Sequence, residues 1–265
     1  RRGDYRTEDL RVAADGTRTV RLYNAQETTP SFAVMYKPRQ DLSLYASYVE
    51  GLEESGQAPA SSANAFQLLD PAKSEQREVG AKFKIGQNSL AQIAYFDIDR
   101  ASTFEDPNTM VFGLNGKANY SGFEMAWTGE LNKQLSIAAS ALLMDAELQN
   151  DGNPATVGKV PENTAEKTAS LFAEYRLISV PGLSFNGGLY YTGERAVNDQ
   201  NQAFIGGYTV ASLGVRYATV IGSTPTQFQL VVDNPTDKNY YSTAGNGLIG
   251  VGTPRTIKAI VSVDL

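Results

Sequence analysis

The sequence predicts an all-β protein that forms an antiparallel up-and-down transmembrane β-barrel. Helical periodicity is nearly missing from the 265 residues. Segments of about ten residues alternate apolar and polar side chains, which is the pattern of a strand with one apolar and one polar face. The connections between these segments are alternately short and long, as expected when tight periplasmic turns alternate with extended outer loops.

The alternation is clearest in Arg255–Leu265, where every second side chain from Ile257 to Leu265 is apolar. Successive side chains of a strand point to opposite faces, so one face of this strand is apolar and the other is mostly polar. Counting such segments gives about eleven strands, with a possible further one in Tyr5–Ala13. Two segments, Ser89–Ile98 and Leu135–Leu143, are apolar on both faces in places. The same alternation occurs in Glu78–Ile85, Thr168–Leu177, Leu183–Tyr191, Ser212–Tyr217 and Gln227–Asp233.

The predicted connections divide into two classes by length. The short ones lie at Pro38–Asp41, Gly86–Asn88, Leu131–Lys133, Ile178–Gly182 and Ile221–Pro225. The long ones lie at Gly51–Ser74, Ala101–Ala118, Gln149–Ala165, Glu194–Gly206 and Pro235–Thr253. If the strands run up and down in order, all short turns meet at one end of the sheet and all long loops at the other. A soluble sandwich has no reason to sort its loops in this way.

Composition excludes several classes of protein. Cysteine and histidine are both absent, which removes disulfide frameworks, the usual zinc sites and imidazole-based catalytic triads. The net charge of -6 and the pI near 4.9 argue against a nucleic-acid partner, because phosphate binding needs a basic face. Mean hydropathy is -0.30 and no run of about 18 apolar residues occurs, so we expect no membrane-spanning helix.

Aromatic residues lie near several predicted strand ends. Amphipathic rings favour the interface between membrane and water, although aromatic residues are also enriched in β-sheets generally. We therefore expect part of this set to form an interfacial belt: Tyr36, Trp127, Tyr175, Tyr191 and Tyr217.

Acidic pairs are the only candidates for chemistry, and both have simpler explanations. Glu53 and Glu54 lie in a predicted outer loop, where we expect them to be solvated. Asp145 and Glu147 share one face of a predicted strand near its outer end, where we expect them to line the lumen. The sequence therefore predicts no catalytic residues, no metal site and no resident cofactor, and a protein that is not an enzyme.

Several stretches resemble the C-terminal barrel half of TonB-dependent siderophore receptors. The family usually has two apolar or aromatic residues after the position of Asn234, whereas this chain has Pro235 and Thr236. Because proline cannot donate to a strand ladder, we expect the strand to end there. The stretches are "LSLYASYVEGLEESGQAP" at Leu42–Pro59, "KSEQREVGAKF" at Lys73–Phe83, "NYSGFEMAWTGEL" at Asn119–Leu131, "VDNPTDKNYY" at Val232–Tyr241 and "GTPRTIKAIVSVDL" at Gly252–Leu265.

The resemblance implies a barrel of about 22 strands that encloses an N-terminal plug domain. On that reading residues 1–265 are the C-terminal part of the receptor barrel and hold about 11–12 of its strands, while the plug domain and the N-terminal strands are absent from the sequence. An open half-barrel leaves two strand edges that lipid cannot satisfy, so we expect the chain to be a fragment of the larger barrel. A closed barrel of about twelve strands is the alternative, and the two would differ in strand tilt and edge pairing.

The resemblance also implies a function in the bacterial outer membrane. The receptor would take up a metal chelate, most simply a ferric siderophore, with energy supplied through TonB. Its partners would be the siderophore or a similar chelate, outer-membrane lipid and lipopolysaccharide, and the TonB complex acting through the missing plug region. Aromatic rings and arginines suit such ligands by stacking and by charge-assisted hydrogen bonds. Candidate ligand-binding residues in the predicted loops are Phe66, Phe104, Phe112, Arg195, Phe204, Tyr240 and Tyr241.

Two other functions remain open at the level of sequence. A passive porin-like channel would use the same kind of wall without a plug and would conduct ions in a planar bilayer. A soluble β-rich binding module, such as a lectin or an adhesin, would pack its apolar faces on each other and stay folded without detergent.

Overall fold

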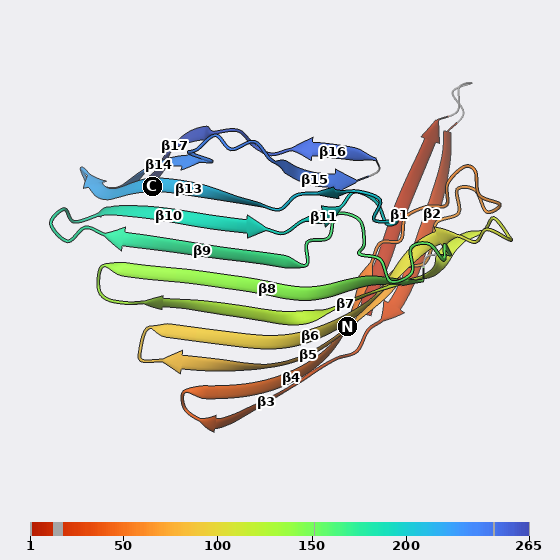
Figure 1. The fold of residues 1–265 in the computed structure, drawn as a ribbon, viewed down its shortest axis with the longest axis horizontal. Helices are drawn as coiled ribbons and strands as arrows, with labels where there is room; N and C mark the ends of the chain where they lie inside the picture. The colour runs from red at the N-terminus through yellow and green to blue at the C-terminus, as the bar shows by residue number, and fades with distance from the viewer. Residues whose placement is uncertain (1, 13–17, 151, 246, 265) are drawn as a thin grey trace.

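The protein is built from β-strands, most of which join in one antiparallel sheet (Figure 1). The computed structural model describes residues 2–12, 18–150, 152–245 and 247–264. In this part of the chain no helix is long and apolar enough to cross a membrane. The strands are β1 Arg2–Val12, β2 Arg18–Thr28, β3 Ser31–Arg39, β4 Leu42–Glu53, β5 Ala72–Ile85, β6 Ser89–Glu105, β7 Phe112–Glu130, β8 Leu135–Asn150, β9 Lys167–Arg176, β10 Leu183–Thr192, β11 Arg195–Ala196, β12 Phe204–Ile205, β13 Tyr208–Ile221, β14 Thr224–Asp233, β15 Tyr241–Gly245, β16 Leu248–Val251 and β17 Thr256–Val263.

The main sheet has 11 strands in the order β17-β14-β13-β10-β9-β8-β7-β6-β5-β4-β3, so strands that follow one another in this set are neighbours. This confirms the predicted up-and-down order and the predicted strand number. Three small sheets, β1-β2, β11-β12 and β15-β16, stand apart from it. Within the described residues β3 and β17 are edges and do not pair with each other, so the closed barrel of about twelve strands is wrong for this sheet. The possible strand in Tyr5–Ala13 corresponds to β1, and Ala13 lies outside the described residues.

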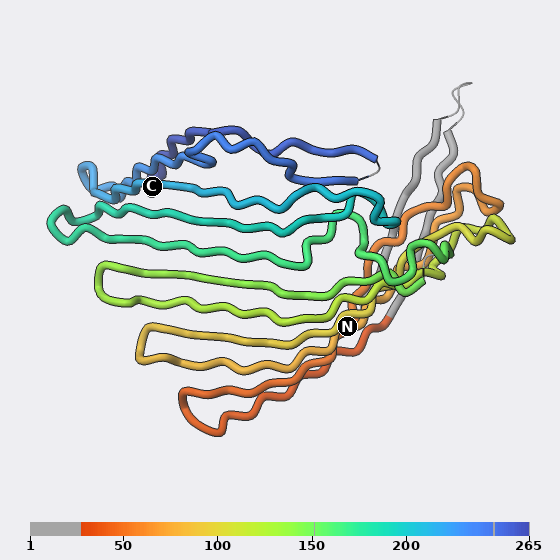
Figure 2. The backbone as a smooth tube through the Cα atoms, viewed as in Figure 1, coloured from red at the N-terminus to blue at the C-terminus, as the bar shows by residue number. Residues whose placement is uncertain are grey.

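Short turns and long loops lie at opposite ends of the sheet, as predicted. The turns that follow β3, β5, β7, β9 and β13 lie together at the left of Figure 1, and the long connections lie at the right. The chain trace in Figure 2 shows the same succession of hairpins from one side of the sheet to the other. The prediction that a strand ends before Pro235 is also confirmed, because β14 ends at Asp233.

One face of the sheet is apolar across all eleven strands. Its residues are brought side by side by the strand register, as where Leu213 pairs with Val232 and Val215 with Leu230. These side chains are uncovered by the described residues: Val79 and Leu213 are each 55% exposed. A face of this area would pack against another layer in a water-soluble protein. Its larger members include Phe32, Val34, Leu44, Val79, Phe83, Ile93, Tyr95, Phe123, Met125, Leu143, Leu171, Phe185, Leu189, Leu213, Phe228, Leu230, Ile257 and Val261.

The apolar face ends abruptly on its way to the long loops. At the margin of the apolar face the rings of Tyr95 and Phe123 pack edge to face, with their ring centres 5.2 Å apart. Two residues further along each strand, toward the long loops, the outward side chains become polar or charged on five neighbouring strands. The last apolar row is Ala46, Val79, Tyr95, Phe123 and Leu143, and the first polar row is Tyr48, Arg77, Asp97, Ser121 and Asp145. Such a margin, with aromatic rings at it, is expected where strands leave the hydrocarbon of a membrane.

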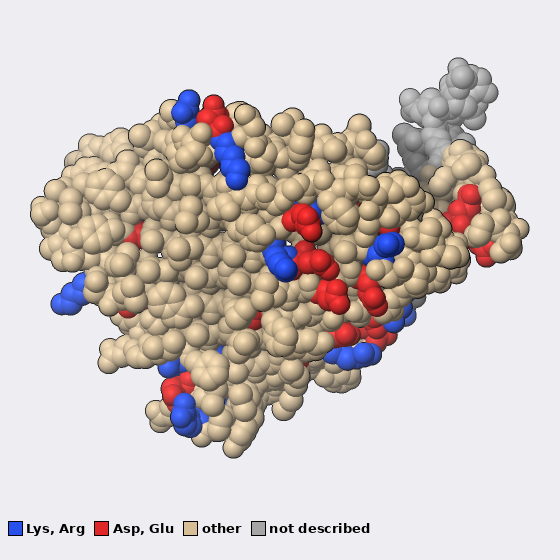
Figure 3. Space-filling view, viewed as in Figure 1, with Lys and Arg blue, Asp and Glu red and all other residues tan. Residues whose placement is uncertain are grey.

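Strands β6, β7 and β8 continue well beyond this margin. They have 17, 19 and 16 residues, whereas β9 and β10 have 10 each. About 9–11 residues suffice for a tilted strand to cross a bilayer, so the longer strands project outward from it. In the space-filling view a group of charged side chains lies toward the loop end of the visible face, and others lie at the short turns and along the upper edge (Figure 3).

The outward projection corrects one prediction about acidic residues. Asp145 pairs with Ser121 and Glu147 with Asn119, on the same face as Leu143. Asp145 and Glu147 therefore lie on the outside of the wall above the apolar face, and the prediction that they line the lumen is wrong. Charged side chains of a barrel strand are expected toward the lumen, but here they lie beyond the end of the apolar face, where the outward side chains are polar.

Asp99 shows how charges are satisfied in this projecting wall. Asn119 donates to its carboxylate at 3.0 Å, and the ammonium of Lys117 lies 3.1 Å away. The hydrogen bond from Asn119 is the main cause that lowers the pKa of Asp99, and Lys117 adds to it. The carboxylate is thus held ionised outside the apolar part of the strand.

The inner face of the sheet is polar and its charges are paired with each other. The guanidinium of Arg216 contacts Glu174, Arg176 lies 3.0 Å from Glu130, and Lys258 lies 2.7 Å from Asp233. Tyr45 donates to Glu78 further along the wall. A polar inner face with paired charges is expected for the interior of a membrane barrel.

The predicted aromatic belt is found on the outward face. Tyr36, Trp127, Tyr175 and Tyr217 lie toward the short turns, and Tyr191 lies toward the long loops. All five have the parity of the apolar face, as the pairing of Tyr175 with Phe185 illustrates for one of them. The belt and the polar margin therefore bound the apolar face on its two sides.

Candidate functional site

The long loops at the outer end form two hydrogen-bonded groups. In the first group the loop between β4 and β5 contacts the β6–β7 hairpin. Asn64 holds both backbone groups of Phe112, donating to its carbonyl at 2.8 Å and accepting from its amide at 2.9 Å. The amide of Ala63 donates to the Met110 carbonyl at 2.7 Å, and Ser62 donates to Glu105. The Asn64 side chain thus fixes this first loop group, because it binds the N–H and the C=O of one residue as a neighbouring strand would.

The second group joins three loops around Arg195. Its guanidinium is buried, with the residue 6% exposed, and donates to the carbonyls of Tyr241 at 3.1 Å and Ser242 at 2.5 Å. The same group lies 3.3 Å from the amide oxygen of Asn163 and 5.6 Å from the ring centre of Tyr208. Arg195 therefore ties the β8–β9 loop, the β10–β13 connection and the β15–β16 hairpin together.

Two asparagines complete the second loop group. The side-chain oxygen of Asn163 accepts from the backbone amide of Ala244 at 3.0 Å, and the backbone amide of Asn163 donates to the carbonyl of Ala196 at 2.9 Å. Asn201 holds both backbone groups of Val160, at 2.9 Å and 2.7 Å. Both asparagines have positive φ, 57° and 55°, a region that asparagine adopts more readily than most residues. The backbone conformation of these loops at residues 163 and 201 therefore favours asparagine over most other residue types.

The seven predicted ligand-binding residues separate between the two groups. Phe66, Phe104 and Phe112 belong to the first, with the ring of Phe104 packed against Gly152. Arg195, Phe204, Tyr240 and Tyr241 belong to the second, where Tyr240 stacks on Tyr208 at 4.2 Å between ring centres. Phe204 and Tyr241 are 48% and 54% exposed. The structure thus divides the seven residues between the two loop groups, and they do not all line one cavity.

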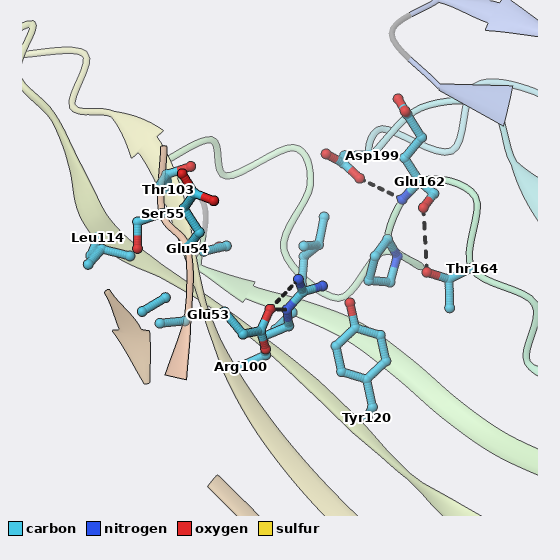
Figure 4. A pocket seen from close by; sticks show the side chains of 16 residues that line it. Glu53, Glu54, Ser55, Arg100, Thr103, Leu114, Tyr120, Glu162, Thr164 and Asp199 are labelled. Carbon is cyan, nitrogen blue, oxygen red and sulfur yellow. Dashed lines mark hydrogen bonds and ion pairs between the residues drawn. The ribbon is translucent and has the colours of Figure 1, made fainter. Parts of the chain in front are cut away.

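A polar cavity lies on the inner face of the sheet where the two loop groups approach each other (Figure 4). Its volume is about 370 Å³. Strands β4, β6 and β7 supply its floor, and the β8–β9 loop and the β11–β12 turn supply its opposite wall. The lining includes Glu53, Glu54, Ser55, Arg100, Ser102, Tyr120, Glu162, Thr164 and Asp199.

An ion pair crosses the floor of this cavity. Arg100 Nε donates to Glu53 Oε2 at 2.7 Å, and a second guanidinium nitrogen contacts the same oxygen. The hydrogen bond that Arg100 donates to Glu53 is the main cause that raises the pKa of Arg100 above its ordinary value, and Tyr120 contributes from beside it. Both groups lie beyond the apolar margin. The prediction that Glu53 lies in the outer loop is therefore wrong, because it ends β4 and pairs across to β6, although its side chain remains 35% exposed. Glu54 follows the strand and is exposed, as predicted.

The opposite wall presents further acceptors. Asp199 Oδ1 accepts from the backbone amide of Glu162 at 2.7 Å, which fixes the β11–β12 turn against the β8–β9 loop. On the strand side, the hydroxyl oxygens of Ser55 and Ser102 are buried and have no hydrogen-bond partner among the described residues. Within the same residues no group of acidic side chains is arranged to hold a metal ion. The cavity is thus polar and open to hydrogen bonding.

Sequence reasoning missed this cavity for two different reasons. Arg100 and Tyr120 could have been found, since period-two alternation places both on the inner face once β6 and β7 are extended to their true lengths. The predicted loop Ala101–Ala118 hid this, because β6 continues to Glu105 and β7 begins at Phe112. Glu162 and Asp199 carry no such signal, since their positions depend on how two irregular loops meet.

Comparison with known proteins identifies the family. The family described as TonB dependent receptor-like, beta-barrel matches residues 2–234. Ferrichrome receptor FcuA of Yersinia enterocolitica is 29% identical over 248 residues, which cover 91% of this chain and 33% of that protein. The probable TonB-dependent siderophore receptor PiuA of Acinetobacter baumannii is 24% identical over 238 residues, which cover 83% of this chain and 31% of that protein.

Solved structures agree on the fold. The ferric preacinetobactin receptor BauA of Acinetobacter baumannii superposes with a TM-score of 0.77 at 25% identity, over 93% of this chain and 37% of that chain. The siderophore receptor PiuA from the same organism gives 0.79 at 20% identity, over 98% and 39%. The chain spans about a third of the length of the curated relatives it matches. It belongs to the TonB-dependent receptor family, and it forms part of the β-barrel by which these receptors sit in the outer membrane.

Proposed function

We propose that the receptor containing this chain imports ferric siderophores across the outer membrane with energy supplied through TonB. One observation supports this function best. The sheet is apolar toward the outside and polar toward the inside, and its inner face bears a polar cavity beneath outer loops that are fixed to one another. FcuA is named a ferrichrome receptor, PiuA a probable TonB-dependent siderophore receptor and BauA a ferric preacinetobactin receptor, which supports a ferric chelate as the ligand.

In this proposal the chain supplies the wall and part of the mouth of the receptor. Residues 1–265 act as the C-terminal part of the barrel, and further strands and a plug domain of the same receptor complete it. The open edges β3 and β17 favour this arrangement, because unpaired strand edges are not satisfied by lipid. TonB would act through the plug, and the wall described here would stay in place while the plug moves.

The metal enters this scheme as part of the transported chelate, and the chain needs no resident cofactor or catalytic group. Of the seven candidate residues, Phe204 and Tyr241 are the most exposed and are proposed to contact the chelate. The buried contacts of Arg195 support a role in positioning the loops that carry them. Lipid and lipopolysaccharide would meet the apolar face and the charged projection above it.

Radio-iron uptake tests the proposal. The whole receptor that carries this chain is produced in a host without siderophore receptors of its own, and iron uptake is measured with a hydroxamate and a catecholate siderophore. We expect saturable uptake of at least one ferric complex that is lost when TonB is deleted. Uptake that persists without TonB, together with ion conductance in a planar bilayer, would instead support a passive channel. A receptor that stays folded and monodisperse without detergent would contradict every membrane function.

A further inference from the structure

We propose that a groove in the apolar face of the wall binds one acyl chain of a phospholipid from the bilayer leaflet at the short turns. The receptor then carries this phospholipid at a fixed site, in addition to the lipids that exchange around the barrel. Because the groove lies on the outside of the barrel, lipid binding there does not depend on siderophore uptake. Three features point to this site: the form of the groove, the residues that close one of its ends, and the small residues that leave the other end open.

The groove crosses strands β5 to β8 on the outward face of the sheet, and its volume is about 410 Å³. Gln92 and Ser140 also border it, but the hydroxyl of Ser140 bonds to Ser170 on the inner face and Gln92 faces Tyr45 there. In one row of the lining the strand register sets large and small side chains alternately side by side, so that methyl groups form a floor between rings: Phe83, Ala91, Trp127 and Ala139. The next row toward the long loops adds Ile93, Met125 and Ala141. The groove is therefore a hollow in hydrocarbon side chains.

Large side chains close the groove toward the long loops. Tyr95 and Phe123 lie one row beyond it, and their rings pack edge to face with centres 5.2 Å apart. Val79 and Leu143 continue this row on the two neighbouring strands. An acyl chain from the leaflet at the long loops would have to cross this row, which is also the margin of the apolar face. The groove is therefore poorly accessible from that leaflet.

The opposite end of the groove is open toward the short turns. In the next row on that side β6 and β7 contribute only Ser89 and Gly129, which pair with each other. Their backbones are so close that a Cβ added to Gly129 would lie 2.0 Å from the hydroxyl oxygen of Ser89. Ile85 and Ile137 flank this pair on the neighbouring strands and rise on either side of it. An acyl chain can thus enter between the two isoleucines from the leaflet at the short turns.

The surroundings of the groove identify its occupant as an acyl chain. The groove is continuous with the face by which the barrel meets the hydrocarbon of the outer membrane. Within hydrocarbon, association is driven by close packing, because the lipid chains are as apolar as the side chains. A flexible, unbranched chain can follow the floor of alanines and regain the dispersion contacts that an unfilled hollow loses. The same packing makes one fixed chain more favourable than chains that pass over the rims.

The test uses Trp127, which lines the groove and is the only tryptophan of the 265 residues. The whole receptor in detergent is titrated with a phosphatidylcholine whose stearoyl chains are dibrominated, because bromine quenches tryptophan fluorescence on contact. The same titration of Trp127→Phe subtracts the signal of tryptophans elsewhere in the receptor. We expect the quenching of Trp127 to saturate at one lipid per receptor.

Three variants assign the lipid to the groove and to its open end. Ala139→Leu and Ala141→Leu each fill part of the floor, and Ser89→Leu narrows the entrance at the short turns. Each is expected to weaken the saturable binding by roughly ten-fold or more, because the chain loses its contacts with the floor. Ala173→Leu is the matched control, since Ala173 has the same outward parity on β9 and does not line the groove. Circular dichroism checks that each variant is folded, and filling the floor at two positions keeps the test independent of any one variant.

Each other outcome overturns the proposal. Quenching that rises without saturation, equally in the wild type and in Ala139→Leu, would mean that Trp127 meets exchanging lipids only. Saturation that survives both floor substitutions would place the lipid elsewhere, and saturation unchanged by Ser89→Leu would contradict entry from the short turns. A receptor dimer that shields Trp127 from the lipid, and that the floor substitutions dissociate, would give the groove to a second copy. Siderophore uptake is measured separately, so none of these results bears on transport.

Discussion

The wall and the outer loops of this barrel are held together in different ways. In the wall, β13 and β14 alone form ten successive register pairs, and no one side chain is needed for the ladder to persist. In the loops, a few side chains such as Arg195, Asn163 and Asn201 supply the contacts that join segments far apart in sequence. Substitutions in the wall should therefore act through the face they occupy, and substitutions in the loops through the particular residue they remove.

The largest effect is expected from a charge on the apolar face. Leu171→Arg places a guanidinium in the middle of β9 between Ala139 and Leu189, where we expect the receptor to lose about 2–4 kcal/mol of folding stability in bilayers. Ser170→Arg, one residue away on the inner face, should cost much less. Urea titration of folding into phospholipid vesicles measures both. Equal costs for the two variants would contradict the assignment of the faces.

Loss of Arg195 should come next and should act locally. Arg195→Met removes charge-assisted hydrogen bonds to two backbone carbonyls, a loss of about 1.5–3 kcal/mol per bond at most. Hydrogen exchange is expected to speed up in the β8–β9 loop and in β15, while the wall strands keep their protection. Arg255→Met, at an exposed arginine between β16 and β17, serves as the control. Faster exchange throughout the wall would show that Arg195 supports the whole barrel.

A smaller effect is expected from Asn201→Ala. The change removes both side-chain bonds to Val160 and leaves a residue poorly suited to positive φ, at a cost of about 1–2 kcal/mol to the loop contact. Limited proteolysis should cut the β8–β9 loop more rapidly than in Asn108→Ala, where the exposed side chain lies in another loop. An unchanged cleavage rate would mean that Arg195 and Asn163 suffice to hold the second loop group.

The smallest effect concerns Asp99 in the projecting wall. Its pKa is lowered in the folded state, so its contribution is present above the unfolded pKa and is lost as the pH falls through the folded value. Asn119→Ala removes the main cause of this shift and should raise the pKa of Asp99 toward its ordinary value. Carboxyl NMR of selectively labelled receptor measures the change. A pKa that stays low in the variant would assign the shift to Lys117 instead.

The wall was predictable from sequence because it repeats one local rule. Alternation in Val79–Ile85 or Phe228–Val232 depends only on which face meets lipid, and this is visible in each strand separately. The rule failed where one face changes its environment along its length. Leu143 and Asp145 share a face, yet one lies within the apolar face and the other beyond it, and only the register with neighbouring strands reveals the margin.

The cavity was predictable only in part. The aromatic and arginine candidates share only a position in the predicted loops, whereas in the structure Arg195 holds the loops of the second group together. Glu53 and Arg100 lie 47 residues apart and become partners through the β4–β5–β6 pairing. Glu162 reaches the cavity because Asn201 and Asp199 fix its loop, and no periodic pattern encodes such a contact.

Site-directed spin labelling along β9 tests most directly that the two faces of the wall meet lipid and lumen. The chain has no cysteine of its own, so single cysteines at residues 169 to 175 can be labelled in the reconstituted receptor one at a time. We expect oxygen accessibility to exceed that of a water-soluble nickel chelate at Ala169, Leu171 and Ala173, and the reverse at Ser170 and Glu174. Accessibility without a period of two residues, or with the two faces exchanged, would contradict the assignment.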